Sequence, residues 1–233
     1  ASAAEDFFHV LRQHQAENPS FDEDRYLRKY HTILKRHYAG TAFELYIRHL
    51  LSKTESPKVL EKHLNAVLEK DALWADAYAR LGDLYAAKSE LRKAVSYYKE
   101  ALRVSEHAGT VELYQNLGQL YIKLREYEVA EETYRKCLEL SPSNASALVS
   151  LADCLKRQKK FEAAVECYDS CIRHSAAERE AFRGKFDALK KLGRTEEAQA
   201  LAAEYPEHFN TKRYRAEAEK ATEEPENMQG HPV

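Results

Sequence analysis

One pattern of large apolar and small residues occurs three times along the chain at an almost constant interval. The small residues Gly82, Gly118 and Ala152 mark the three copies and lie 36 and then 34 residues apart. A repeat of this length indicates one supersecondary unit that recurs along the chain. The copies consist of Tyr78, Leu81, Gly82, Tyr85, Ala94, Tyr98 and Ala101; Tyr114, Leu117, Gly118, Tyr121, Ala130, Tyr134 and Cys137; and Leu148, Leu151, Ala152, Leu155, Ala164, Tyr168 and Cys171.

The spacing within each copy predicts two helices. Tyr78, Leu81 and Tyr85 lie three or four residues apart, so they share one face of a first helix. Ala94 and Tyr98 share one face of a second helix in the same way. Small residues on the facing sides let the two helix backbones approach closely. A single pair cannot bury its apolar face alone, so we expect neighbouring copies to stack.

Residues 75–178 resemble three tandem tetratricopeptide repeats, because Leu-Gly-x-x-Tyr occurs twice and Pro142 stands at a turn position that the family favours. Tyr78, Tyr114 and Leu148 replace the family's Trp, and the first and third copies lack the turn proline. The resemblance implies an all-α fold, a right-handed α-solenoid of antiparallel helix pairs. It also implies a concave groove, lined by the first helices, that holds other proteins.

Weaker copies flank these repeats. In one of them Arg48 stands where Gly82 stands in the next copy, and in the other a turn at Gly193 joins two short helical stretches. The predicted organisation is an N-terminal helical extension at 1–40, a degenerate repeat at 41–74, full repeats at 75–108, 111–144 and 145–178, a partial repeat at 179–205, and a polar capping helix with a disordered tail at 206–233.

Charge and hydropathy exclude two classes of function. The chain has 36 Lys and Arg against 38 Asp and Glu, a formal net charge of −2, which argues against a nucleic-acid-binding protein. No apolar run approaches the roughly 20 residues that cross a bilayer, so we expect no membrane span. The chain begins Ala-Ser-Ala without Met, as a shortened chain or a processed precursor would. Reduced cysteines suit an intracellular protein, and both a cytoplasmic and a mitochondrial location stay open.

Cys167, Cys171 and His174 share one helical face, where a metal site can be imagined. Structural zinc sites usually draw on two separated segments, and the chain has no Cys-x-x-Cys. Cys137 and Cys171 stand where Ala101 stands in the first copy, and a buried thiol there acts as a small apolar side chain. We therefore expect no metal and no cofactor.

The motifs of common enzyme classes are missing from the sequence. There is no Gly-x-Gly-x-x-Gly, no phosphate-loop Gly-Lys-Ser/Thr, no His-Glu-x-x-His and no Gly-x-Ser-x-Gly. We expect a protein that is not an enzyme.

Some tetratricopeptide-repeat proteins grip the C-terminal carboxylate of chaperones through a Lys, two Asn, a Lys and an Arg. The matching positions here are Ala79, Asp83, Asn116, Ser146 and Ser150, so only Asn116 agrees. Without the cations a carboxylate would lie unpaired, so we expect no chaperone-tail carboxylate clamp.

The resemblance places the partner-binding groove on the first helices of the repeats. Its candidate residues are Arg80, Asp83, Asn116, Gln119, Lys123, Asp153, Lys156, Arg157, Lys190 and Lys191. The cations near the helix C-termini would form a basic strip along one rim. They either complement the helix dipoles or anchor an acidic segment of a partner, and the sequence leaves both interpretations open.

The sequence therefore predicts a non-enzymatic scaffold or adaptor that binds one or more proteins in the groove. The alternative is a permanent structural subunit of a large assembly, such as a mitochondrial respiratory or ribosomal complex.

Overall fold

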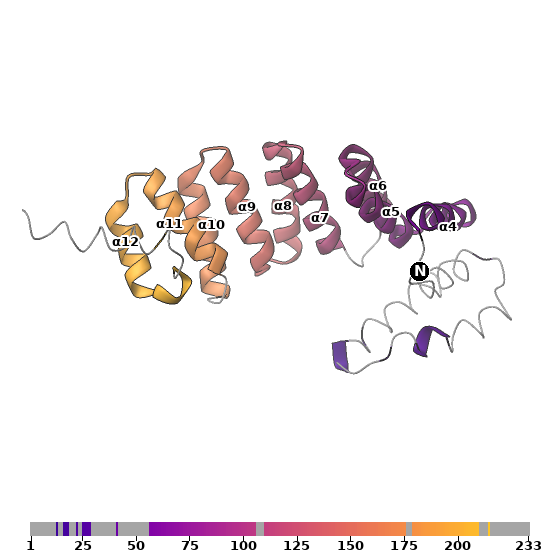
Figure 1. Ribbon diagram of the computed structural model, residues 1–233, viewed down its shortest axis with the longest axis horizontal. Helices are drawn as coiled ribbons and strands as arrows, with labels where there is room; N and C mark the ends of the chain where they lie inside the picture. Colours follow the sequence, from indigo (N-terminus) through magenta and orange to yellow (C-terminus); the bar gives the residue numbers. More distant parts are fainter. Residues whose placement is uncertain are drawn as a thin grey trace, which may run out of the picture. The chain divides into compact units, whose positions relative to one another are not determined.

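The computed structural model describes residues 56–105, 110–175 and 179–209, together with residues 13, 16–18, 22, 25–28, 41 and 214. Every regular element in these ranges is a helix, which confirms the predicted all-α class. None of these helices has the length and apolar character needed to cross a membrane. The chain divides into two compact units, Ala1–Gly109 and Thr110–Val233 (Figure 1). Most of the predicted N-terminal extension lies outside the described residues.

The first unit contains α4 (Pro57–Lys70), α5 (Ala75–Ala87) and α6 (Leu91–Val104). α4 begins at Pro57, because the fixed φ of proline suits the first helical turn. α5 packs against both α4 and α6. Leu64, Leu81 and Tyr98 from these three helices are buried, so the predicted apolar faces form the core of this unit.

The second unit is a run of helices, each of which contacts the next along the chain (Figure 1). In order they are α7 (Thr110–Lys123), α8 (Tyr127–Leu140), α9 (Ala145–Arg157), α10 (Phe161–His174), α11 (Arg179–Lys191), α12 (Thr195–Glu204) and the 3-10 helix η1 (Pro206–His208). α9 also contacts α7 and α11, so the first helices of successive pairs lie side by side. Asn144 fixes the start of α9 by accepting a 3.0 Å hydrogen bond from the backbone N–H of Ala147.

The small residues of the repeat lie against the recurring tyrosine of the second helix in the same pair. A methyl group added at Gly82 would lie 3.0 Å from the Tyr98 ring, and one added at Gly118 would lie 2.7 Å from Cζ of Tyr134. Tyr134 and Tyr168 are among the largest fully buried side chains. The predicted close approach of the helices is therefore a close approach of a tyrosine ring to a helix backbone.

The turn inside each described pair passes through one residue with left-handed backbone. These residues are Ser89, Arg125, Lys159 and Gly193, with φ values of 61°, 61°, 63° and 78°. The residue after each one donates a hydrogen bond back to the first helix, as from the N–H of Glu126 to the carbonyl of Tyr121 at 2.9 Å. The left-handed region favours glycine, yet only the last of the four turns contains it.

Aromatic side chains pack against α11 at the C-terminal end of the second unit. Phe186 lies 5.4 Å from Phe209 and 5.5 Å from Tyr214 between ring centroids, and Phe209 and Tyr214 are buried. The Tyr214 hydroxyl also lies 3.5 Å from Oδ2 of Asp187. Most of the polar capping helix predicted at 206–233 lies outside the described residues, and of the five that are described, Phe209 and Tyr214 are buried aromatic side chains.

Candidate functional site

The predicted groove residues of the second unit lie on α7, α9 and α11, and α9 contacts both of its neighbours. We call this surface the first-helix face. Asn116, Asp153 and Lys156 on it are half-buried, whereas Gln119, Lys123, Arg157, Lys190 and Lys191 are exposed. The other two predicted residues, Arg80 and Asp83, lie on α5 in the first unit, so they form a separate group.

Tyrosines of two second helices donate hydrogen bonds to aspartates of the first helix in the same pair. Tyr168 on α10 donates to Oδ1 of Asp153 on α9 at 2.5 Å, and Tyr98 on α6 donates to Oδ1 of Asp83 on α5. Burial and the neighbouring Asp153 carboxylate raise the pKa of Tyr168, so the phenol keeps its proton. Two predicted groove residues therefore already accept a hydrogen bond from their own pair.

The pair α7–α8 lacks this hydrogen bond. Gln119 takes the position that Asp83 and Asp153 take in the other pairs, one residue after the small residue. The hydroxyl of Tyr134 is buried and has no hydrogen-bond partner among the described residues. Ser150 of α9 lies beside the phenol without completing a hydrogen bond to it. Burial raises the pKa of Tyr134 to about 12, so its hydroxyl is a donor at neutral pH.

The cations at the end of α9 lie over aromatic rings. Lys156 forms an ion pair with Asp153 at 3.1 Å, and its Nζ lies 5.6 Å from the centroid of the Tyr168 ring. Cζ of Arg157 lies 5.9 Å from the centroid of the Tyr127 ring. Both distances are close to the roughly 6 Å limit for cation–π attraction. This attraction holds the two cations near the surface of the unit.

The remaining cations of the basic strip lie at the ends of α7 and α11. Nζ of Lys190 lies 5.8 Å from the centroid of the Phe186 ring. Lys123 and Lys191 are exposed and form no ion pair with any other described residue. Because these positions are in the last helical turns, each cation also faces the negative end of a helix dipole.

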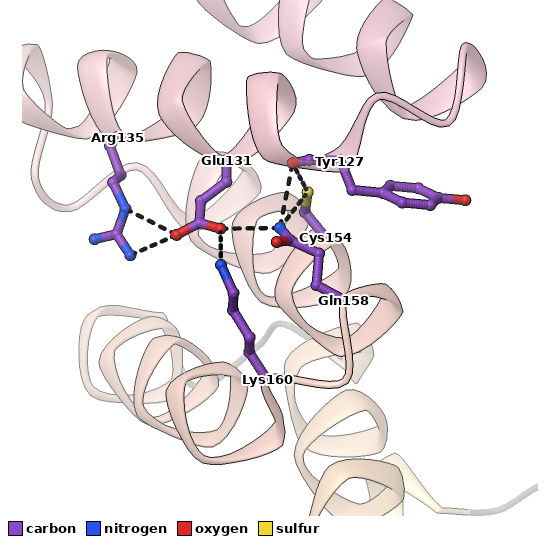
Figure 2. A network of polar contacts seen from close by, with 6 residues as sticks. All are labelled: Tyr127, Glu131, Arg135, Cys154, Gln158 and Lys160. Carbon is purple, nitrogen blue, oxygen red and sulfur yellow. Dashed lines mark hydrogen bonds and ion pairs between the residues drawn. The ribbon is translucent and has the colours of Figure 1, made fainter.

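A polar cluster around Glu131 joins α8 to the α9–α10 turn (Figure 2). Glu131 accepts hydrogen bonds from Nη2 of Arg135 at 2.9 Å, from Nε2 of Gln158 at 2.9 Å and from Nζ of Lys160 at 2.8 Å. Burial raises the pKa of this carboxyl, but hydrogen bonds from Lys160, Arg135 and Gln158 outweigh burial and hold it at about 2. The cluster therefore fixes α8 against the following pair through an ionised carboxylate.

Cys154 belongs to the same cluster (Figure 2). Its thiol donates to the backbone carbonyl of Tyr127 at 2.9 Å, and Gln158 donates to that carbonyl at 3.2 Å. Burial raises the pKa of Cys154, and it also raises the pKa of Cys137 and of Cys167. In the part of the chain that the structure describes, no three His, Cys, Asp or Glu side chains converge on a possible metal position. The Cys154 thiol therefore links α9 to the start of α8.

Comparison with models of known protein families identifies the family of these helix pairs. Two models, both described as tetratricopeptide repeat, match residues 74–143 and 116–179. Residues 74–179 are tetratricopeptide repeats. A crystal structure of YrrB, described as a tetratricopeptide-repeat protein with an unusual peptide-binding site, superposes with a TM-score of 0.69 at 19% identity, covering 82% of this chain and 97% of that one. This likeness shows the fold and confirms the predicted α-solenoid.

Curated relatives of this chain are much longer proteins. The general transcriptional corepressor ssn6 of Schizosaccharomyces pombe is 25% identical over 52% of this chain. A repeat-containing protein of Methanocaldococcus jannaschii is 28% identical over 60% of it. The matched segments span only 11% and 26% of those two relatives.

The polar cluster around Glu131 was not found by sequence reasoning, although the tetratricopeptide repeats contain a signal for it. Aligned by the repeat, Glu61, Val95, Glu131 and Val165 occupy one position, so a carboxylate alternates with an apolar residue. Glu61 on α4 accepts hydrogen bonds from the Tyr85 hydroxyl at 2.5 Å and from Nζ of Lys88 at 2.7 Å. Hydrogen bonds from Lys88 and Tyr85 lower the pKa of Glu61. Two junctions between successive pairs therefore use a polar contact.

Proposed function

We propose that this chain binds a partner polypeptide on the first-helix face of its second unit, formed by α7, α9 and α11, and that it does so without catalysis. Tetratricopeptide repeats generally mediate protein–protein interactions. We choose this face because Lys123, Arg157 and Lys191 lie at the ends of three neighbouring helices. YrrB, a protein of the same fold, is described as having a peptide-binding site, which is consistent with this choice.

The basic strip favours an acidic segment as the part of the partner that reaches these helices. Exposed cations of one sign attract an oppositely charged chain and steer its approach, so the association should weaken as salt is added. Lys123 and Lys191 are available for such a contact, since neither forms an ion pair with a described residue. Lys156 is less available, because it pairs with Asp153 at 3.1 Å.

A charge reversal on the face tests this function. Lys156→Glu/Arg157→Glu should reduce capture of partner proteins from a native extract while circular dichroism shows unchanged helix content. The matched control is Lys136→Glu/Arg173→Glu, which changes the net charge equally on exposed positions of the second helices α8 and α10. Equal capture by the two double variants and the wild type, measured by quantitative mass spectrometry, would exclude the first-helix face as the binding surface.

No observation favours the alternative of a permanent subunit of a respiratory or ribosomal assembly. The names of the matched relatives do not refer to such an assembly.

A further inference from the structure

One buried donor of α8, the Tyr134 hydroxyl, has no acceptor among the described residues, and the neighbouring repeats show what kind of group fills the same position. Tyr134 is 1% exposed, and its hydroxyl has no hydrogen-bond partner among the described residues. A buried hydroxyl without a partner costs free energy, so such groups are rare and call for an explanation. In the pair that follows, the equivalent phenol of Tyr168 donates to the carboxylate of Asp153 at 2.5 Å.

The position of the missing acceptor opens on the surface of the protein. The Asp153 side chain is 47% exposed although it is bonded to the buried phenol of Tyr168. Asp83 is likewise exposed while it accepts from Tyr98. A carboxylate can therefore stand at this position and still face solvent. At Tyr134 the same position is next to the exposed side chain of Gln119, which can move aside.

Two neighbouring helices form the sides of this position. A methyl group added at Gly118 of α7 would lie 2.7 Å from Cζ of Tyr134, so the phenol passes directly beside that helix. Ser150 of α9 also lies close to the phenol. α7 and α9 are in contact, so the hydroxyl of Tyr134 lies at the junction of these two first helices.

The charges around this junction favour an anion. Lys123 lies four residues after Gln119 on α7, and Arg157 lies four residues after Asp153 on α9, so both cations share the helix faces that flank Tyr134. The Asp153 carboxylate of α9 is already paired with Lys156 and accepts from Tyr168. An incoming carboxylate would therefore meet a donor hydroxyl and two cations without a facing unpaired anion.

We propose that a Glu or Asp side chain of the partner polypeptide enters between α7 and α9 and accepts the hydrogen bond that the Tyr134 hydroxyl does not make with any described residue. This inference rests on the proposed function, because it names the partner group that binds on the first-helix face. The site exists because residue 119 is Gln. An aspartate at this position would itself accept the hydrogen bond from the Tyr134 hydroxyl. The site recognises a side-chain carboxylate and needs no free C-terminus.

A defined peptide tests the assignment. The probe is a fluorescent hexaglutamate with an acetylated N-terminus and an amidated C-terminus, and hexaglutamine with the same ends is the control ligand. The full chain should bind hexaglutamate but not hexaglutamine, as measured by fluorescence anisotropy. Tyr134→Phe should raise Kd about tenfold, because a hydrogen bond to a charged acceptor is lost. Tyr98→Phe is the matched control and should leave Kd within about twofold, since that hydroxyl already has Asp83 as its acceptor.

A second variant tests the same site in the opposite way. Gln119→Asp should place an acceptor beside Tyr134, raise Tm and weaken hexaglutamate binding at least about tenfold, since it fills the site and adds a negative charge. In protein labelled with 13C at tyrosine Cζ, the resonance that Tyr134→Phe removes should shift when hexaglutamate is added. These readouts do not depend on knowing the natural partner.

Unchanged Kd in both Tyr134→Phe and Gln119→Asp would overturn the carboxylate site but leave the proposed function in place, provided that Lys156→Glu/Arg157→Glu still loses partner capture. The carboxylate site would also be overturned if the wild-type chain did not bind hexaglutamate. This holds even if the cause were that glutamates at 217–226 of the same chain, or of a second copy, occupied the position. Partner capture unaffected by the charge reversal would contradict the proposed function itself.

Discussion

The hydroxyl of Tyr168 lies 2.5 Å from Oδ1 of Asp153 and joins α10 to α9 through a hydrogen bond to a charged acceptor. In the preceding pair, the hydroxyl of Tyr134 forms no hydrogen bond with a described residue. Among the described residues, the same tyrosine position therefore has an acceptor in the α9–α10 pair and none in the α7–α8 pair before it. This difference should be visible in stability as well as in binding.

Tyr168→Phe should lower the free energy of unfolding by about 1–2 kcal/mol, because it removes a hydrogen bond to a carboxylate and leaves Asp153 without that donor. Tyr134→Phe is the matched variant. It should change the free energy of unfolding by less than about 0.5 kcal/mol or raise it, since it removes a buried hydroxyl that has no partner among the described residues. Urea unfolding of both variants measures the contrast, and equal losses would show that Tyr134 is hydrogen-bonded in solution.

Glu131→Gln should destabilise the protein by about 1–3 kcal/mol at pH 7, because the carboxylate accepts hydrogen bonds from Lys160, Arg135 and Gln158. The pKa of Glu131 is about 2 in the folded chain, below its ordinary value of 4.5. Its contribution is therefore fully present above about pH 4.5 and is lost as the pH falls from there towards 2. The difference between wild type and variant should shrink over that range.

A neighbouring carboxylate provides the control for this pH dependence. Glu132 lies on the same helix, is 68% exposed and pairs with Lys136 at 3.0 Å. Glu132→Gln should change stability by less than about 0.5 kcal/mol at any pH, as exposed ion pairs contribute little. Urea midpoints measured between pH 7 and pH 3 would test both variants. A constant difference between wild type and Glu131→Gln would show that the pKa of Glu131 is not lowered.

Gly184→Ala should destabilise the protein by about 1–3 kcal/mol, even though alanine favours helices, because the added methyl group would lie 2.3 Å from Cζ of Tyr168. Gly82→Ala should cost much less. Its methyl group would lie 3.0 Å from the Tyr98 ring, and Ala152 occupies the same repeat position naturally. Thermal unfolding of both variants measures the ranking, and a larger loss at Gly82 would contradict the packing described here.

Lys159→Gly should stabilise the protein by about 0.5–1 kcal/mol. Lys159 has a φ of 63°, and this left-handed backbone conformation is less favourable in free energy for a residue with a side chain than for glycine. Gly193→Ala is the inverse change in the equivalent turn, where φ is 78°, and should destabilise by a similar amount. Nothing lies within 4 Å of a methyl group added at Gly193, so the effect there is one of backbone conformation alone. Changes of the same sign in both variants would contradict the left-handed turns.

The repeat pattern alone predicted the all-α class, the helix pairs and the family. The reason is that the interval between Gly82, Gly118 and Ala152 fixes which side chains face each other within a pair, wherever the pair lies. The sequence also placed Lys123, Lys156 and Arg157 near helix ends, because the helix boundaries follow from the same spacing. For the groove, it predicted a set of positions but not the contacts that each position makes.

Only the tertiary structure decided which of those positions are already engaged. Asp153 was predicted as a groove residue, yet Tyr168 and Lys156 both contact it. Gln119 was predicted as one of several polar residues, and with Gln119 in the place of an aspartate the Tyr134 hydroxyl has no partner among the described residues. Hydrogen bonds between helices depend on small differences in distance between side chains that are far apart in the chain, and a periodic pattern does not carry that information.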